Sequence, residues 1–145
     1  MVSIRQEILI EATPEQVWAA VRDVGSVHLR LVPGQVVDTR LEGDSRTLTF
    51  ANGAVVLELI VAVDDEARRL AYAVVEGRMP LLHHHASFQV FADGAGRSRL
   101  VWITDVLPHA LAGEVRLRVE RGAAIVRYPI AEARGMWSRS EHAWT

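Results

Sequence analysis

Hydrophobic and polar residues alternate along most of the chain with the two-residue period that is typical of half-buried β-strands. In the first alternating segment Ile4, Ile8 and Ile10 share one face, whereas Arg5 and Glu7 lie on the other. Short polar or glycine-containing connections separate the later segments, which indicates antiparallel hairpins rather than a parallel sheet with crossover helices. The predicted strands cover residues 4–12, 36–41, 46–50, 55–63, 70–76, 82–91 and 99–107.

Two short helical segments are predicted between the first strand and the second. Thr13 is suited to cap a helix, Pro14 suits its first position, and Gln16 is placed to complete a capping box. A second segment covers residues 27–31 and ends at Pro33-Gly34. We therefore expect a helical connection before the run of hairpins begins.

A longer helix is predicted from Leu111 to Tyr128, where apolar residues recur at helical spacing. Gly122 lies within it, and glycine costs about 1 kcal/mol relative to alanine in a helix interior, so we expect close packing or a bend at this residue. Pro129 is expected to end the helix. The chain is therefore predicted to form one domain over residues 1–129, followed by a tail over residues 130–145.

Composition excludes several classes of function. The 145 residues suffice for one domain with a substantial core, and the net charge of -2 with scattered basic residues argues against nucleic acid or an acidic membrane surface as partner. The absence of cysteine and lysine excludes disulfides, thiolate chemistry and Schiff-base chemistry. No apolar run approaches the roughly 18 residues of a membrane span, and the first residues lack the apolar core of a signal peptide, so we expect a cytoplasmic protein. Phosphate-loop, serine-elbow and zinc-protease motifs are absent from the sequence, which argues against nucleotide binding and serine hydrolysis. No cofactor is expected.

Five framework segments carry a family resemblance. They are Ala12-Thr13-Pro14-Glu15-Gln16-Val17-Trp18, Glu58-Leu59-Ile60-Val61-Ala62-Val63-Asp64-Asp65-Glu66, Arg69-Leu70-Ala71-Tyr72, Leu100-Val101-Trp102 and Pro108. With these segments the chain resembles the START/Bet v 1-like (SRPBCC) superfamily and, within it, the polyketide cyclase/dehydrase-like proteins, over residues 3–128. The resemblance implies an α+β helix-grip fold, in which a curved antiparallel sheet of about seven strands wraps around a long C-terminal helix, with two short helices after the first strand.

The resemblance also implies an internal cavity that binds or transports a small hydrophobic ligand, such as a lipid, a polyketide or an aromatic compound. One alternative is a polyketide aromatase/cyclase or dehydratase with Glu58 and His84 as acid and base candidates, and another is an interaction protein with a vestigial cavity. The abscisic-acid receptors of the superfamily place a pocket glutamate at Glu58 and pocket aromatics at Tyr72 and His84, whereas their pocket lysine has no counterpart here. The expected ligand-binding residues are Val56, Glu58, Ile60, Tyr72, Val74, His84, Phe88, Trp102, Val115 and Val119.

The orientation of Glu58 has two interpretations. Alternation along residues 54–63 places Glu58 in water and its odd-numbered neighbours in the core, whereas the resemblance places Glu58 toward the cavity. In the second case an unpaired carboxyl group would have a raised pKa, and Leu57, Leu59 and Val61 would form an apolar outer face that needs a cover. The tryptophans of the tail, or a second subunit in a homodimer, would supply this cover.

Three consecutive histidines, His83-His84-His85, form the most visible polar run. Neighbours on a strand point to opposite faces, so His83 and His85 share one face and His84 lies on the other with Phe88. A metal site needs three or more converging ligands, and the sequence supplies no obvious third ligand, so no metal site is predicted. His84 is interpreted either as a hydrogen-bonding or proton-transferring residue of the cavity or as a structural histidine.

Other positions are expected near the cavity. Trp102 is predicted to face inward together with Thr104. Glu76 is interpreted either as a cavity residue or as a solvated carboxylate at the end of its strand. The connections at Asn52-Gly53 and Gly77-Arg78-Met79-Pro80 are expected at the cavity mouth, where such loops often gate ligand entry.

Overall fold

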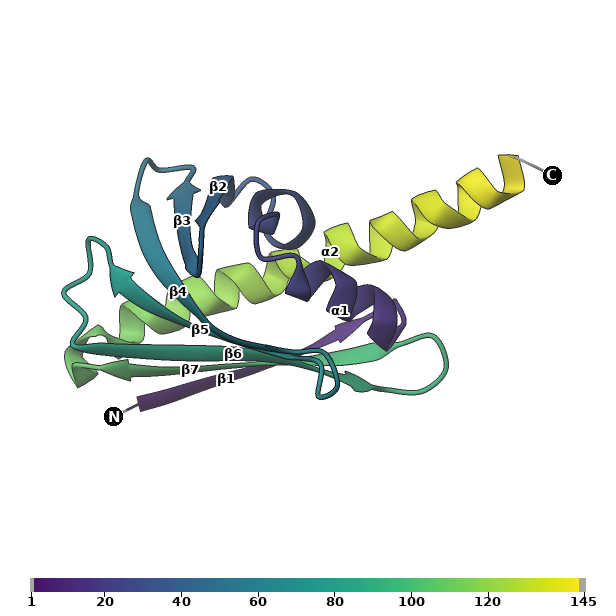
Figure 1. Ribbon diagram of the computed structural model, residues 1–145. Coiled ribbons are helices and arrows are strands. Elements are labelled where there is room, and N and C mark those ends of the chain that lie inside the picture. Colours follow the sequence, from purple (N-terminus) through teal and green to yellow (C-terminus); the bar gives the residue numbers. More distant parts are fainter. Residues whose placement is uncertain (1, 144–145) are drawn as a thin grey trace.

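A computed structural model describes the backbone of residues 2–143 and the side chains of residues 2–133. Seven antiparallel strands form one curved sheet, and a long helix packs along its concave side (Figure 1), which confirms the predicted helix-grip architecture. The strands are β1 (Val2–Ile10), β2 (Val36–Glu42), β3 (Ser45–Phe50), β4 (Val55–Asp64), β5 (Arg69–Glu76), β6 (His83–Ala92) and β7 (Ser98–Leu107). The helices are α1 (Pro14–Arg22), η1 (Val27–Leu31), η2 (His109–Leu111) and α2 (Ala112–Ala143).

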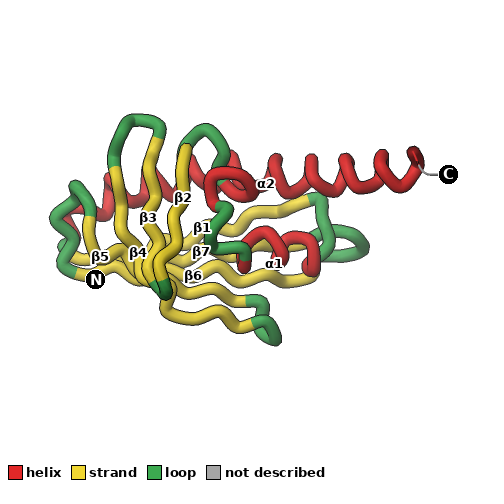
Figure 2. The backbone as a smooth tube through the Cα atoms, turned by 45° about the horizontal axis from the view of Figure 1, so that its top comes forward, coloured by secondary structure: helices red, strands yellow, loops and turns green. Residues whose placement is uncertain are grey.

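The strand order in the sheet is β1-β7-β6-β5-β4-β3-β2. Consecutive strands from β2 to β7 are therefore antiparallel neighbours, as their short connections predict, and β1 pairs with β7. Two register shifts interrupt the pairing of β4 with β5, one at Val75 and one at Val61. Bulges of this kind increase the local twist. Figure 2 shows β2, β3 and β4 turned away from the direction of β1, β6 and β7.

The predicted faces and caps of the first two elements are observed. Ile4, Ile8 and Ile10 of β1 are buried. At the start of α1, Thr13 and Gln16 form the reciprocal hydrogen bonds of the predicted capping box. The second predicted helical segment is η1, a single turn of π-helix.

The turn between β4 and β5 anchors α1. The indole Nε1 of Trp18 donates a hydrogen bond to Asp65 Oδ1 at 2.9 Å, and Arg22 Nε donates to the same oxygen at 2.8 Å. Hydrogen bonds from Arg22 and then from Trp18 lower the pKa of Asp65. Trp18 and Val21 are also buried, so this side of α1 packs into the core.

The expected end of the last helix at Pro129 is wrong, because α2 continues through Pro129 to Ala143. A proline removes a backbone donor from a helix interior and costs about 3 kcal/mol. Val126 and Ile130 on either side of it are both buried in the core, and this packing holds the helix together. The domain boundary placed after residue 129 stays a prediction.

Gly122 permits close packing of α2 on the sheet. A Cβ atom at this position would lie 2.9 Å from two ring carbons of Trp102 on β7, closer than carbon atoms approach without strain. The close packing expected from a glycine within the helix is therefore confirmed, and it places the Trp102 ring directly beneath α2.

Candidate ligand-binding cavity

A cavity of about 150 Å³ lies between the concave side of the sheet, η1 and α2. Nine of the ten predicted ligand-binding residues line it, and the tenth, Ile60, packs against the neighbouring core and is not among the described residues that line the cavity. The role of these residues in binding a ligand stays a prediction. The nine are Val56, Glu58, Tyr72, Val74, His84, Phe88, Trp102, Val115 and Val119.

Three aromatic rings from successive strands form one wall of the cavity. The ring centroids of Tyr72 and Phe88 are 6.0 Å apart, and those of Phe88 and Trp102 are 4.7 Å apart, with both pairs stacked. The indole Nε1 of Trp102 donates a hydrogen bond to Tyr72 Oη at 3.2 Å. Burial raises the pKa of Tyr72, so its phenol remains neutral at physiological pH.

Glu58 faces the cavity side and is 5% exposed, so alternation alone gave the wrong face and the family resemblance the right one. Its partner is Arg46, which is 3% exposed and lies directly opposite on β3. Arg46 donates to Glu58 Oε1 from Nε at 2.9 Å and from Nη2 at 2.6 Å. Burial raises the pKa of Glu58, and the charge and hydrogen bonds of Arg46 oppose this shift. Because both hydrogen bonds go to Oε1, Oε2 has no hydrogen-bond partner within the described part of the chain.

Arg46 also contacts other walls of the cavity. Its Nη1 donates to the carbonyl oxygen of Val24 at 3.3 Å, and its guanidinium carbon lies 5.3 Å from the centroid of the Tyr72 ring, a cation–π distance. The sequence analysis missed this residue. The signal that could have found it is the alternation of Arg46 with Leu48 and Phe50, which places all three on one face of their strand.

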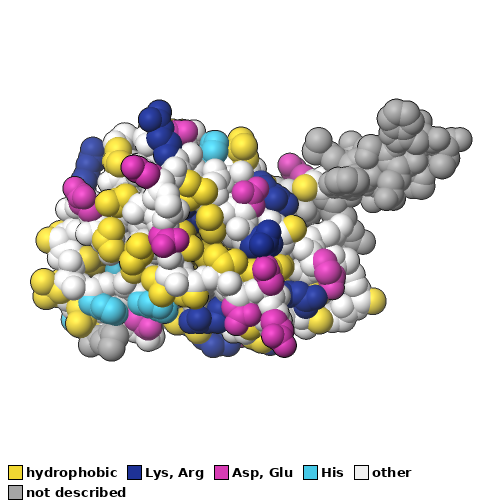
Figure 3. All heavy atoms as spheres, viewed as in Figure 1, with side chains coloured by type: hydrophobic (Ala, Val, Ile, Leu, Met, Phe, Trp, Pro, Cys, Tyr) yellow, Lys and Arg dark blue, Asp and Glu magenta, His cyan; other side chains and the backbone are white. Residues whose placement is uncertain are grey.

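The outer face of β4 is apolar and exposed, as the inward orientation of Glu58 implies. Leu59 is 41% exposed and Val61 is 51% exposed. Figure 3 shows hydrophobic side chains gathered in the middle of this side of the molecule, with charged groups around them. The tail tryptophans that were expected as a cover, Trp137 and Trp144, lie outside the described side chains. A homodimer that covers this face stays a prediction.

His84 lines the cavity, and its ring is held by the backbone of β5. The Val74 backbone N–H donates to His84 Nδ1 at 3.0 Å. Burial, and then the nearby imidazoles of His85 and His83, lower the pKa of His84 to about 4. The imidazole is therefore neutral at physiological pH, with its proton on Nε2.

His83 and His85 lie on the opposite face of β6 from His84, as predicted, and do not line the cavity. Within the described residues, no group of three or more histidine, aspartate or glutamate side chains is placed to hold a metal ion.

Thr104 is a further polar residue of the cavity wall. It lines the cavity beside Trp102, as predicted, and is 1% exposed. Its hydroxyl oxygen has no hydrogen-bond partner among the residues that the structure describes. Buried polar atoms without a partner are rare in proteins, and an unseen water or ligand is the usual explanation.

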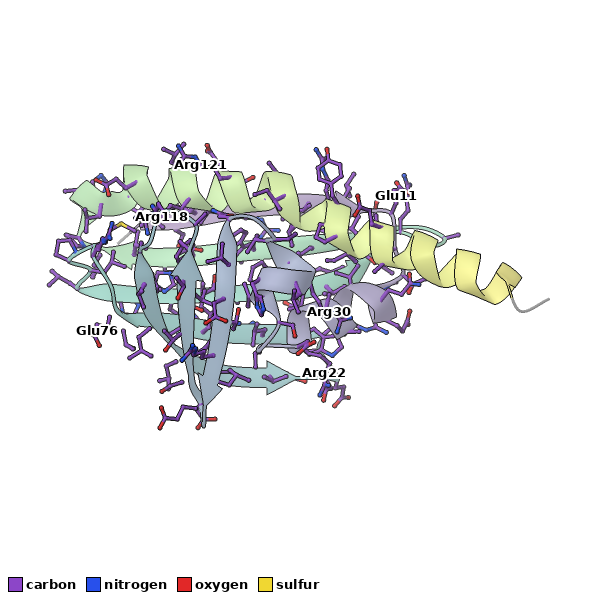
Figure 4. The ribbon with its side chains drawn as sticks, turned by 90° about the horizontal axis from the view of Figure 1, so that it is seen from above. Glu11, Arg22, Arg30, Glu76, Arg118 and Arg121 are labelled. Carbon is purple, nitrogen blue, oxygen red and sulfur yellow. The ribbon has the colours of Figure 1, made fainter. Side chains whose placement is uncertain are left out.

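The connection between β5 and β6 forms part of the cavity wall. Gly77, Arg78 and Met79 of this connection line the cavity, as does Arg118 of α2, which Figure 4 shows on the side of the helix toward the strands. Glu76 is exposed and points away from the sheet (Figure 4), because the register shift at Val75 turns the end of β5 over. Its interpretation as a solvated carboxylate is therefore correct.

The Asn52-Gly53 turn contributes to a shallower hollow next to the cavity. Asn52 lines this hollow together with Gln35, Phe50 and Arg118, of which the last three also line the cavity. The gating role that was expected for both connections stays a prediction.

Among the described residues, no helix is both long and apolar enough to cross a bilayer.

Comparison with known proteins gives a family and a set of similar folds. A family model described as polyketide cyclase / dehydrase and lipid transport matches residues 1–127 of the chain. A search of curated proteins finds no significant match. A solved structure from Thermobifida fusca is 25% identical and superimposes with a TM-score of 0.78, with 94% of this chain and 95% of that chain covered.

Two similar structures carry functional names. Truncated norcoclaurine synthase from Thalictrum flavum is 18% identical, with a TM-score of 0.72 over 91% of this chain and 92% of that chain. The di-domain ARO/CYC protein BexL of the BE-7585A biosynthetic pathway is 16% identical, with a TM-score of 0.78 over 90% of this chain and 46% of that chain. At these identities the likeness shows a shared fold.

Proposed function

The chain belongs to the polyketide cyclase/dehydrase and lipid transport family, and on this premise we propose that its cavity binds or carries a small hydrophobic ligand. The observation that carries the proposal is the composition of the cavity wall. Apolar residues and the stacked rings of Tyr72, Phe88 and Trp102 surround a few polar groups. Binding pockets for small molecules are typically apolar, with a small number of polar groups that fix the orientation of the ligand.

The size of the cavity favours a compact ligand. Pockets for drug-sized molecules have volumes of about 300–1,000 Å³, whereas this cavity has about 150 Å³. A longer lipid or polyketide would fit only if the β5–β6 connection, with Arg78 and Met79, moved outward. We therefore expect compounds with one or two rings to bind more tightly than long-chain fatty acids.

Thermal unfolding with a ligand panel tests this proposal. A ligand that binds only the folded state at 100 times its Kd stabilises it by about 2.7 kcal/mol, which raises the Tm of a domain of this size by roughly 5–10 °C. The panel contains monocyclic and bicyclic aromatic ketones and phenols together with fatty acids. The proposal requires a saturable rise in Tm with at least one of these compounds.

Two variants of α2 show whether the binding occurs in the cavity. Val119 is buried and lines the cavity, whereas Leu117 on the same helix is exposed. Val119→Phe places a larger ring in the cavity and is expected to abolish the rise in Tm. The matched change Leu117→Phe is expected to leave it intact. Equal ligand responses of the two variants would show that the ligand binds elsewhere.

A polyketide cyclase or dehydratase is the second candidate function. The free Oε2 of Glu58 and the raised pKa of this carboxyl group favour it, because a raised pKa suits a carboxyl group to general acid catalysis. His84 is less suited to act as a base, since its pKa of about 4 leaves it weakly basic. Loss of turnover of a poly-β-keto substrate in Glu58→Gln, with binding retained, would establish catalysis by this residue.

A further inference from the structure

Thr104 and His84 lie together on one part of the cavity wall. Both line the cavity, Thr104 from β7 and His84 from β6. Thr104 pairs with Ala86, which is two residues from His84 and therefore on the same face of β6. Diagonal positions on neighbouring strands are within reach of long side chains, so both residues can contact a single atom of a ligand.

Each of these side chains has an unused hydrogen-bond donor. The Thr104 hydroxyl is buried and has no partner in the described part of the chain. The Nδ1 atom of His84 accepts from the Val74 N–H, so Nε2 carries the proton and acts only as a donor. Among the described residues, no acceptor is found for this Nε2–H group.

We propose that Thr104 and His84 form a hydrogen-bonding subsite for the carbonyl oxygen of the ligand, which is a compact aryl ketone. This inference rests on the proposed binding function and adds the class of ligand to it. Two neutral donors match the two lone pairs of a carbonyl oxygen. The stacked rings of Phe88 and Trp102, which pair directly with each other on the same two strands, supply a flat wall for the aryl ring.

The charges around the cavity bear on the choice between a ketone and a carboxylate. The buried charges of Arg46 and Glu58 are paired with each other. Arg78 and Arg118 also line the cavity, and no ion pair involves either within the described residues. A carboxylate ligand would be drawn to these two arginines, whereas a ketone would use Thr104 and His84. An anionic probe therefore belongs in the test.

The test uses acetophenone, α-methylstyrene and benzoate as probes. In α-methylstyrene a CH2 group replaces the carbonyl oxygen of acetophenone, so the shape is retained and the acceptor is lost. Because these two probes differ in hydrophobicity, each variant is compared with the unaltered protein for one probe at a time. Affinities are measured by NMR titration, and the carbonyl stretch of bound ¹³C-labelled acetophenone is measured by infrared difference spectroscopy.

The variants are Thr104→Val, which removes the hydroxyl, and His84→Asn, whose amide oxygen can still accept from the Val74 N–H. One neutral hydrogen bond corresponds to about a 2- to 12-fold change in Kd. Each variant is expected to weaken acetophenone by this factor, to leave α-methylstyrene unweakened, and to move the bound carbonyl stretch to higher wavenumber. Thr49→Val on β3, outside the cavity, is the control and is expected to change none of these quantities.

The remaining outcomes separate the subsite from the proposed function. If Thr104→Val and His84→Asn change both neutral probes equally, the subsite is wrong and cavity binding stands. If benzoate binds more tightly than acetophenone and responds to Thr104→Val, the subsite takes an anion and the ketone assignment is wrong. If none of these three probes binds the unaltered protein while another compound of the thermal-unfolding panel does, the subsite is wrong and cavity binding stands. If no compound of that panel binds either, the proposed function fails as well.

Discussion

Replacing Arg46 by methionine should destabilise the protein in a strongly pH-dependent manner. The change leaves Glu58 buried at 5% exposure without its only hydrogen-bonding partner in the described part of the chain. Breaking a buried ion pair by removing one partner typically costs about 3–5 kcal/mol. The variant can avoid part of this cost by folding with Glu58 protonated, and the free energy of that protonation limits the loss of stability.

The cost of the unpaired charge cannot exceed about 1.4 kcal/mol for each pH unit above the pKa of Glu58 in the native pair. Burial raises that pKa above 4.5. At low pH Glu58 is protonated and needs no cationic partner, so the loss of stability caused by Arg46→Met grows as the pH rises. Between pH 5 and pH 7 this penalty can therefore grow by at most about 3 kcal/mol. The lost hydrogen bond from Arg46 to the Val24 carbonyl adds about 1 kcal/mol at both pH values.

Urea denaturation of Arg46→Met at pH 7 and pH 5 measures this difference. The double variant Arg46→Met/Glu58→Leu removes both charges and is expected to recover most of the stability, because a buried ion pair can be replaced by apolar residues at little cost. Arg40→Met is the control, since the Arg40–Asp38 pair is exposed and should contribute less than about 1 kcal/mol. An equal loss of stability in Arg46→Met at both pH values would refute the assignment of a buried, titrating carboxylate.

Three further changes test individual contacts. The pKa of His84 is lowered to about 4, so the stability that depends on its neutral ring is present above pH 6.5 and is lost, by as much as about 3 kcal/mol, as the pH falls from 6.5 to 4. His84→Asn should flatten this pH dependence of the stability. A pKa of His84 near 6.5, measured by NMR, would contradict the prediction. Gly122→Ala should lower stability by about 1–3 kcal/mol, because the new Cβ lies 2.9 Å from Trp102. Gly113→Ala in the same helix adds a carbon with no atom within 4 Å and should not lower stability. Calorimetry of the two variants measures the difference. Thr104→Val should raise stability by about 1 kcal/mol, because it removes a buried hydroxyl without a partner. A lower free energy of unfolding in denaturant titration would instead show that a water satisfies this hydroxyl.

The local pattern of the sequence predicted most of the framework. The period of two along β1 gave the buried face with Ile4, Ile8 and Ile10, and the Thr13 and Gln16 side chains gave the start of α1. These predictions succeed because strand faces and helix caps depend on residues only two to four positions apart. The same reasoning placed His84 and Trp102 toward the interior, where the structure has them.

Residues whose environment depends on distant parts of the chain were decided only by the tertiary structure. Pro129 was expected to end the last helix, but the burial of Val126 and Ile130 outweighs the local preference of proline. Glu76 is exposed because a register shift exchanges the two faces of β5 at its end.

The ion pair of Arg46 with Glu58 illustrates the same limit within the candidate site. The sequence shows Glu58 in an apolar strand and Arg46 in the preceding strand, 12 residues earlier. Only the register between β3 and β4 places the two side chains opposite each other, and that register depends on the geometry of the connecting turn. The sequence by itself determined the shell and most of the apolar residues that face into it. The tertiary structure decided which polar groups in that shell are paired and which, like the Thr104 hydroxyl, are left without a partner in the described part of the chain.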